Sequence, residues 1–446
     1  MSEEFEAPHQ LLLAVATVAL GFALEVENGA YSPSALMLLA VALLTSFAVF
    51  FLRGARGVGG ALPVTKPLAG LIALELAVLA WRPIAAGFPV EGARAWPYAA
   101  GIAASAALVA AIAFAPRRWS RLALPLLLVV FVATAIWVLR QARPRIDVFI
   151  FQQISAKALL AGRNPWALTF PNPYPDGRFY GPGLVVDGRL QFGFPYPPLP
   201  LLMVLPAYVL AHDVRYAHVL AVAIAAGLIA LTRPSRSASL FAALFLFTPR
   251  VFFLLLLGWT EPLVVLLFAL LGFTLARKPK LVPYAFGLFL AVKQYLVFVP
   301  LLAGLLARGR RLVHLLGLAA LVTFVAIVPL AAWNARAFFH SAVSLQFVQP
   351  FRRDSLSFAA WIARTTGVEL SSLAFLAVAP ALVLVARKAP RSAAGFAAAV
   401  AATYLTFFAF NKQAFANYYY FVIGALCVAA ASIKPAAKSS AAAGAS

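Results

Sequence analysis

Long apolar runs recur along this chain of 446 residues and limit what it can fold into. Hydrophobic residues make up 63% of the sequence and charged residues 11%, whereas a soluble domain carries about twice that share of charge. A helix of about 17 to 25 apolar residues crosses a bilayer. Runs that approach or reach this length are residues 11–24, 35–52, 68–81, 99–114 and 122–139. We therefore expect an all-α, polytopic integral membrane protein, a helical bundle of about 12 to 13 transmembrane helices.

Positive charge is distributed in a way that predicts the topology. The chain has 36 basic and 14 acidic residues, a formal net charge of +22. Short basic segments separate the apolar runs and are expected to be cytoplasmic: residues 53–66, 117–121, 233–236, 277–280, 308–311, 387–391 and 434–438. Because no run of Lys and Arg alternates with aromatic residues, we expect membrane lipids and no nucleic acid as partners.

These assignments divide the chain into three parts. Residues 1–116 form an N-terminal transmembrane block of four helices, and residues 117–433 form a second transmembrane module. Its external loop, residues 140–196, is expected to carry short amphipathic helices, and residues 434–446 to form a disordered cytoplasmic tail. Glu75 falls inside a predicted span, where an ionisable group is by default a functional candidate. With no charged partner nearby in the sequence, a packing role between helices is the favoured interpretation.

Two apolar segments do not fit a simple crossing. His212 and Asp213 split the segment between residues 197 and 233 into two runs, although the charge pattern permits one net crossing, so one run is expected to be re-entrant. Lys293 and Gln294 interrupt residues 281–307. A lysine facing lipid at mid-bilayer costs at least about 2.5 kcal/mol. We therefore expect two short helices with Lys293 and Gln294 at their tip, facing a cavity open to the outside.

Asp147 is the strongest candidate for chemistry. It follows a long apolar helix and begins a run with helical spacing that includes Phe149, Gln153 and Lys157. A carboxylate at the membrane surface can act as a general base on a hydroxyl group within hydrogen-bond reach. Two structural alternatives stay open, because Asp147 could pair with Arg145 or cap the helix that follows.

Further external segments carry groups that bind phosphate or sugar. Cations are found at Lys293, at Arg352 and Arg353, and at Lys412. Arginine pairs bind phosphate through two parallel hydrogen bonds, and lysine binds it as a point charge. Glu261 adds a carboxylate, and Asn411 and Tyr418 add an amide and an aromatic ring. Each also has a structural explanation, since aromatic residues and arginines commonly contact lipid headgroups.

Several of these residues occur in an order that resembles a known family. Asp147 is followed by an Ala-rich run ending in Leu-Leu-Ala-Gly-Arg-Asn164-Pro-Trp166, and Tyr196-Pro-Pro-Leu precedes the next apolar run. This arrangement resembles the first external loop of GT-C membrane glycosyltransferases, and within them glycosyltransferase family 87, the polyprenyl-phosphate-mannose-dependent mannosyltransferases. Lys293-Gln294 with Pro300 is similar to a Lys-Pro-Gln motif of that family, although Gln and Tyr follow the lysine here. The resemblance covers residues 120–433.

The resemblance implies a function and a site. Asp147 would deprotonate an acceptor hydroxyl, which attacks a sugar carried on polyprenyl phosphate with inversion at the anomeric carbon. The donor phosphate would be bound by Lys293, Arg352, Arg353, Lys412 and Arg145. The sugar and acceptor pocket would be shaped by Gln294, Asn164, Trp166, Tyr196, Glu261, Asn411 and Tyr418.

The same resemblance implies the partners and the location. The donor would carry mannose or a related sugar, the acceptor would be a glycolipid or polysaccharide, and the active site would face outward from the cell membrane. No cofactor and no metal site are expected, because no His, Asp and Glu cluster has the spacing of metal ligands. The alternatives are a polytopic transporter or lipid flippase, and a non-catalytic support protein. Against a transporter, the polar residues concentrate in one external loop and not at mid-bilayer.

Overall fold

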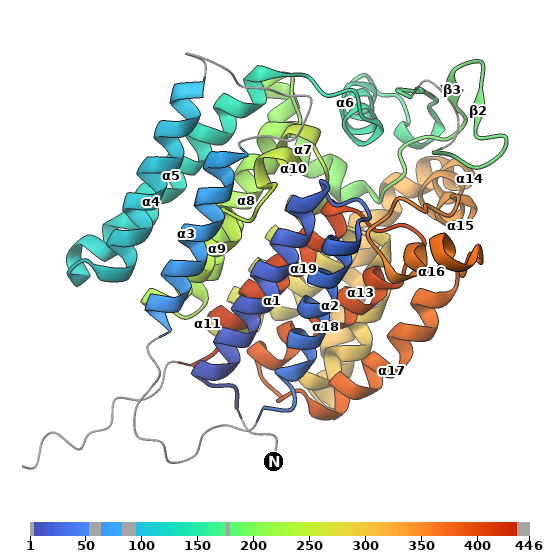
Figure 1. The fold of residues 1–446 in the computed structure, drawn as a ribbon. Helices are drawn as coiled ribbons and strands as arrows, with labels where there is room; N and C mark the ends of the chain where they lie inside the picture. Colours follow the sequence, from blue (N-terminus) through green and yellow to red (C-terminus); the bar gives the residue numbers. More distant parts are fainter. Residues whose placement is uncertain (1–3, 53–63, 83–94, 175–178, 435–446) are drawn as a thin grey trace, which may run out of the picture.

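The computed structural model describes residues 4–52, 64–82, 95–174 and 179–434, and its regular structure is almost entirely helical (Figure 1). In this part of the chain, 5 helices are long and apolar enough to cross a membrane. They are α1 (Ala7–Val26), α4 (Trp96–Phe114), α5 (Arg117–Gln141), α8 (Arg215–Thr232) and the helical stretch Gly309–Val348, which begins with α13 (Gly309–Ala331). A sixth is the pair α9 (Arg236–Leu246) and α10 (Val251–Leu257), bent by 53°. The expected all-α helical bundle is confirmed, and 5 or 6 of the expected 12 to 13 transmembrane helices meet this criterion in the described residues.

The first four helices attach to the remainder as two pairs. Helix α1 and α2 (Pro33–Ala48) pack on α18 (Ala393–Ala409) and α19 (Ala416–Ala431), while α3 (Thr65–Trp81) and α4 pack on α9 and α5. Gly29, in the turn after α1, has φ +79°, and a Cβ there would lie 2.5 Å from the backbone nitrogen of Ala416. Only glycine permits this approach. The four-helix block 1–116 is thus in contact with the module along both pairs. The predicted tail beyond Lys434 lies outside the described residues.

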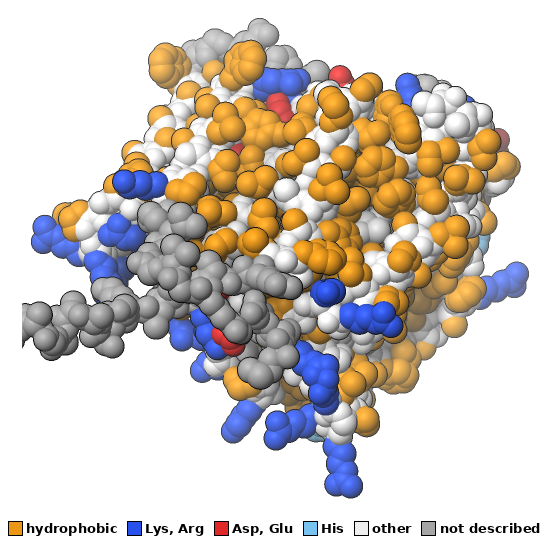
Figure 2. Space-filling model, turned by 60° about the horizontal axis from the view of Figure 1, so that its bottom comes forward, with side chains coloured by type: hydrophobic (Ala, Val, Ile, Leu, Met, Phe, Trp, Pro, Cys, Tyr) orange, Lys and Arg blue, Asp and Glu red, His pale blue; other side chains and the backbone are white. Residues whose placement is uncertain are grey.

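One end of the bundle is basic. Lys434 pairs with Glu4 at 2.8 Å, and Arg236 donates to the carbonyl of Ala113 at 2.8 Å. Figure 2, which brings the bottom of Figure 1 forward, shows a broad hydrophobic face with Lys and Arg gathered towards its lower margin. We call this the basic end, and the opposite end, which carries α6 (Asp147–Leu160), the loop end. Described residues of several basic segments thus lie at one end, as the positive-inside pattern predicts, while residues 53–63 and 435–438 of the predicted basic segments lie outside the described residues.

Helix α7 (Pro198–Ala211) starts and finishes at the loop end. Trp166 in the loop donates to the carbonyl of Tyr196 just before α7. At the other end of α7, Gln153 of α6 donates to the carbonyl of His212 and accepts from the amide of Val214. Because both ends lie against the loop, α7 does not cross the bundle, and α8 makes the crossing to the basic end. The split at His212 is therefore a return to the same side.

The segment around Lys293 is a hairpin of two short helices. Helix α12 (Val282–Ala291) follows the turn η3 (Pro279–Leu281), and the 3-10 helix η4 (Gln294–Leu305) leads to the start of α13. Their far ends carry the exposed basic residues Lys280 and Arg310, so both helices run between the basic end and Lys293. Lys293 is the extended residue between them and forms the tip, as the sequence predicts.

The loop end contains a small sheet that the sequence analysis did not predict. After η2 (Pro165–Ala167) come β1 (Phe170–Pro171), β2 (Val185–Val186) and β3 (Arg189–Leu190), antiparallel in the order β1-β3-β2. Asp187 and Gly188 join β2 to β3 with φ of 48° and 69°. An Asp-Gly pair in this conformation is the favoured two-residue hairpin turn. That dipeptide was the signal for strands in an otherwise helical protein.

A second segment covers this loop. It consists of η5 (Ala332–Asn334), α14 (Ala335–Phe338), the π-helical η6 (Phe339–Ser344) and α15 (Leu345–Val348). Ser341 accepts a bond from the amide of Gly193 at 2.8 Å and donates to the carbonyl of Trp166 at 3.1 Å. The hydroxyl of Ser341 therefore joins this second segment to the loop. The remaining helices are α11 (Glu261–Arg277), α16 (Phe358–Thr366) and α17 (Leu373–Lys388).

Candidate functional site

Asp147 is the first residue of α6, and two tyrosines of the loop hold its carboxylate. Ile146 is the extended N-cap residue, so Asp147 is not the cap. Oδ2 accepts a hydrogen bond from the hydroxyl of Tyr180 at 2.9 Å, Oδ1 accepts from the amide of Val148 at 2.7 Å, and Tyr174 adds a third bond. Arg145 is exposed and forms no ion pair with Asp147 in the described chain. Both structural alternatives for Asp147 are thus absent from this geometry.

The environment of Asp147 changes its acidity in two directions. Burial raises the pKa of the carboxyl above its ordinary value, because a charged group loses hydration. Hydrogen bonds from Tyr180, Val148 and Tyr174, and then the charge of Arg352, act to lower that pKa. The net direction is upward. A carboxylate with a raised pKa is a stronger base than an exposed one while its anion stays bound by donors.

Arg352 reaches the site from the loop that follows α15. Its guanidinium lies 4.4 Å over the ring of Phe179 and 4.8 Å over that of Phe415. It also donates to Asp354 at 2.8 and 2.6 Å. Burial acts to raise the pKa of Asp354, but the bonds from Arg352 outweigh burial and hold this pKa below its usual range. Phe179 precedes Tyr180 in the chain, so the same turn of the loop contacts Arg352 and Asp147.

Lys293 forms a second centre beside the first. Its Nζ lies 3.1 Å from Oε1 of Glu261, donates to the hydroxyl of Thr260 and sits 3.9 Å over the ring of Tyr196. Glu261 is fully buried and Lys293 is 4% exposed. Burial, followed by the charges of Glu261 and Asp147, raises the pKa of the Tyr196 phenol. Tyr196 is therefore within electrostatic reach of both carboxylates and connects the two centres, as does Tyr418.

Buried polar atoms without partners accumulate around Lys293. Oε2 of Glu261, Oε1 of Gln294 and the hydroxyl of Tyr295 are buried with no hydrogen bond. In the loop after α6, Nδ2 of Asn164 is also buried without a partner. Gln294 is held in place by its amide nitrogen, which donates to the carbonyl of Pro195 at 3.1 Å. Buried polar groups are otherwise almost always bonded, so each such atom calls for a bound water or ligand. Together they offer acceptors and donors suited to a hydroxyl-rich ligand.

The other predicted residues lie in different surroundings. Trp166 connects its loop to the segment before α7, because its indole donates to the carbonyl of Tyr196 at 3.1 Å. Lys412 donates to the carbonyls of Gln349 at 2.6 Å and Phe347 at 3.3 Å, and burial lowers the pKa of its ammonium. Its neighbour Asn411 accepts from the amide of Gln413 through its side chain.

The structure thus divides the predicted set. It places Asp147 within electrostatic reach of Arg352, Tyr196 and Tyr418, and the same two tyrosines within reach of Glu261, which pairs with Lys293. Arg353 is bound at 2.8 Å to Glu369, with both side chains exposed. Glu75 is fully buried in α3, and neither carboxylate oxygen has a hydrogen bond.

Sequence reasoning missed the two tyrosines that bind Asp147. Tyr174 and Tyr180 lie in a segment rich in proline and glycine, in which aromatic residues have no helical or strand periodicity. The only available signal was their phenol groups within a loop predicted to be functional. The pairing of Lys293 with Glu261 was also missed, although both residues were candidates.

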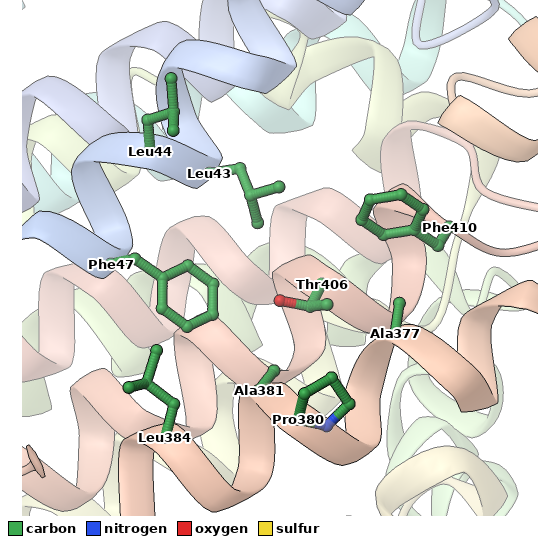
Figure 3. Close-up of a pocket in the computed structure, with 9 residues that line it drawn as sticks. All are labelled: Leu43, Leu44, Phe47, Ala377, Pro380, Ala381, Leu384, Thr406 and Phe410. Carbon is green, nitrogen blue, oxygen red and sulfur yellow. The ribbon is translucent and has the colours of Figure 1, made fainter.

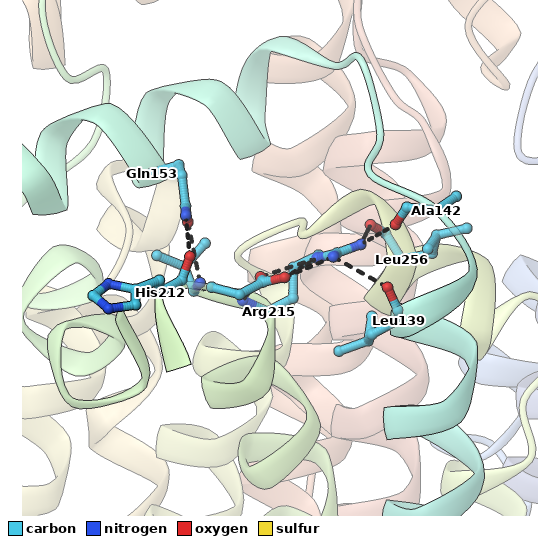
Figure 4. A network of polar contacts seen from close by, with 8 residues as sticks. Leu139, Ala142, Gln153, His212, Arg215 and Leu256 are labelled. Atoms are coloured by element: carbon cyan, nitrogen blue, oxygen red, sulfur yellow. Dashed lines mark hydrogen bonds and ion pairs between the residues drawn. The ribbon is translucent and has the colours of Figure 1, made fainter. Parts of the chain in front are cut away.

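A buried arginine joins the ends of several helices, and Gln153 of α6 bonds to the segment just before it (Figure 4). Arg215, at the start of α8, is 2% exposed and contacts Asp213 at 2.6 Å. It also donates to the carbonyls that end α5 and α10, those of Leu139, Ala142 and Leu256. Its guanidinium lies 5.1 Å from the ring centre of Phe149 on α6. Three helix ends and the helix of Asp147 therefore meet on one side chain.

No group of three or more His, Cys, Asp or Glu side chains placed to hold a metal ion is found among the residues that the structure describes. Comparison with known proteins returned no matching family model, no matching curated protein and no matching solved structure.

Proposed function

We propose that this protein is a membrane glycosyltransferase that moves a sugar, mannose by the resemblance, from a polyprenyl-phosphate donor to a hydroxyl of a glycolipid or polysaccharide. One observation carries the proposal. Tyr196 is within electrostatic reach of Asp147, which Tyr180 binds, and of Glu261, which like Gln294 and Tyr295 has buried atoms without a partner. A sugar bound to these atoms would have its reacting carbon between a base and a cation.

The reaction follows from the placement of Asp147. Its carboxylate takes the proton of the acceptor hydroxyl as the hydroxyl oxygen attacks the anomeric carbon. A bond forms from that oxygen to the carbon, and the bond from carbon to the phosphate oxygen breaks, with its electron pair leaving on polyprenyl phosphate. Attack from the face opposite the leaving group inverts the configuration. The base contributes about 10² to 10⁴ in rate.

Arg352 is the favoured group for the leaving phosphate. It acts electrostatically on Asp147, and its planar guanidinium suits an anion with several oxygens. Its present partner, Asp354, is about half exposed and can exchange to solvent when phosphate enters. Lys293 is committed to Glu261, so its proposed part is to orient Glu261 and the sugar, with Lys412 completing the rim. Arg352 would then stabilise the negative charge on the leaving phosphate more strongly in the transition state than in the bound substrate.

The membrane arrangement is part of the proposal. If the shorter apolar helices also cross, α1 to α5, α8, α9 with α10, α11, α13, α17, α18 and α19 make about twelve spans. Helix α7 then begins and ends at the loop end, and the α12–η4 hairpin begins and ends at the basic end. With the basic end in the cytoplasm, Asp147 faces outward from the plasma membrane.

A matched pair of variants tests the proposal. Asp147→Asn keeps shape and removes the base, whereas Asp187→Asn alters an exposed aspartate of the same loop at a turn position that asparagine tolerates. Transfer of labelled sugar from polyprenyl phosphate to endogenous acceptor is measured in vesicles. We expect a loss of about 10² to 10⁴ for Asp147→Asn and near-normal transfer for Asp187→Asn. Full transfer by a folded Asp147→Asn protein would refute the base.

The transporter alternative gives a different result in the same vesicles. A flippase would move the labelled lipid between leaflets and leave the sugar attached to phosphate. Movement of the lipid without release of polyprenyl phosphate would favour that class, and release without acceptor labelling would exclude both the transfer and the transport interpretations.

A further inference from the structure

An apolar groove lies on the side of the bundle, away from Asp147. It is formed by α2, α17 and α18 and encloses a cavity of about 440 Å³ (Figure 3). Helices α2 and α17 each pack on α18, which forms the floor. The walls include Leu43 and Phe47 on α2 and Pro380 and Leu384 on α17. This volume is in the range of small-molecule sites, about 300 to 1,000 Å³.

The groove offers nothing polar to an occupant. Its one hydroxyl belongs to Thr406, which donates to the carbonyl of Ala402 within α18. All other lining side chains are aliphatic, aromatic or proline. The part of a ligand that lies inside must therefore be hydrocarbon, because a polar group would be buried there without a partner.

A cation marks one end of the groove. Leu384 and Lys388 are four residues apart on α17, and Phe47 and Phe51 are four residues apart along α2 and the turn that follows, so each pair shares a face. The ammonium of Lys388 lies 5.5 Å from the ring centre of Phe51. Lys388 has no acidic partner among the described residues, and it is exposed at the basic end. The helix dipole also stabilises a basic residue at the C-terminal end of a helix, and this is a structural reason for Lys388. The dipole does not explain why the ammonium lies over the ring of Phe51.

We propose that the groove binds one acyl chain of an anionic phospholipid from the leaflet at the basic end, with the lipid phosphate on Lys388. Charge complementarity selects this occupant. A donor lipid for the Asp147 site would instead carry its phosphate at the loop end, the opposite end of the groove from Lys388. A zwitterionic lipid would gain less from the ammonium. The inference does not depend on the proposed transferase activity.

Competition between two lipids tests this site. The purified full chain is placed in nanodiscs that contain equal amounts of phosphatidylglycerol and phosphatidylcholine with identical acyl chains, and the retained lipids are measured by native mass spectrometry. We expect about fivefold preferential retention of phosphatidylglycerol, the contribution of one basic residue at an anionic surface. Lys388→Ala should remove the preference and Lys388→Arg should keep it. Lys280→Ala, which removes an exposed lysine of the same end away from the groove, should have no effect.

A second variant tests the chain rather than the headgroup. Leu384→Trp fills the groove and should lower retention of both lipids by about tenfold or more, since it excludes several methylene groups. Equal retention of the two lipids by the wild type would overturn the proposal. So would equal losses in Lys388→Ala and Lys280→Ala, unchanged retention in Leu384→Trp, or a polyprenyl lipid or a second copy of the chain bound in place of phospholipid. Thermal unfolding checks that each variant is folded.

Discussion

Two of the buried ion pairs in the described residues, both at the loop end, differ in how completely their polar atoms are bonded. Arg215 and Asp213 form a closed set, in which the guanidinium also binds the carbonyls of Leu139, Ala142 and Leu256. Lys293 and Glu261 form an open set, in which Oε2 of Glu261 and the neighbouring Gln294 and Tyr295 keep unpartnered atoms.

The difference separates a structural role from a binding role. A fully bonded network fixes helix ends, because every polar group that lost water has a new partner. A network with missing partners is costly unless a ligand or water completes it. On this basis we propose that Arg215 positions α6, whereas Lys293 and Glu261 belong to the binding site. The predictions below test that division, from the largest expected effect to the smallest.

Removing Arg215 should have the largest effect on stability. Arg215→Leu leaves Asp213 buried without its cation and leaves helix-end carbonyls unbonded. Loss of one partner from a buried pair costs about 3 to 5 kcal/mol in the free energy of unfolding. Denaturant titration in detergent micelles measures this. The double variant Arg215→Leu with Asp213→Leu should recover little, since the carbonyls remain unbonded. Recovery to wild-type stability would contradict the structural role.

The same treatment of the open pair should separate stability from activity. Lys293→Met with Glu261→Gln removes both charges at nearly constant volume, and such replacements of buried pairs are commonly neutral for stability. Sugar transfer should nevertheless fall about a hundredfold, because an oriented polar group at the reacting centre is lost. Unfolding and transfer are measured on the same preparation. Normal transfer by this double variant would place the pair outside the site.

A change in pH dependence should follow from the tyrosine that binds Asp147. The base must be ionised, so kcat/KM falls as pH decreases through the pKa of Asp147. The bond from Tyr180 stabilises the carboxylate and lowers this pKa, and Tyr180→Phe should therefore shift the acidic limb to higher pH. Tyr98→Phe, which removes a phenol bonded to the carbonyl of Leu79, is the control. A limb that stays in place or moves to lower pH would argue against Asp147 as the base.

The smallest effect is expected for an ion pair on the surface. Arg353 and Glu369 are bonded at 2.8 Å but are 52% and 42% exposed. Exposed pairs contribute about 0 to 1 kcal/mol and are screened by salt. Arg353→Ala should leave both the unfolding curve and sugar transfer close to wild type. A large loss of transfer would return Arg353 to the phosphate-binding residues expected from the sequence.

Local patterns accounted for much of the fold. The apolar runs predicted a helical membrane protein, and the spacing of Phe149, Gln153 and Lys157 predicted the helix that starts at Asp147. The interruption at Lys293 predicted the hairpin, because a lysine cannot face lipid cheaply at mid-bilayer. The small sheet was missed, since its strands have two residues each and only the Asp187–Gly188 turn marks them.

By itself, the sequence determined the helical, apolar character of the protein, the alternation of apolar runs with short basic segments and the residues able to carry charge at the loop end. Those properties depend on apolar length, helical period and residue type, which are local. Tertiary structure decided which charges are paired, Lys293 with Glu261 and Arg353 with Glu369, and it brings Arg352 within electrostatic reach of Asp147. It also brought the hydroxyl groups of Tyr174 and Tyr180, which lie in an irregular loop, into hydrogen-bond contact with Asp147. Such contacts join segments distant in sequence, so packing alone selects them.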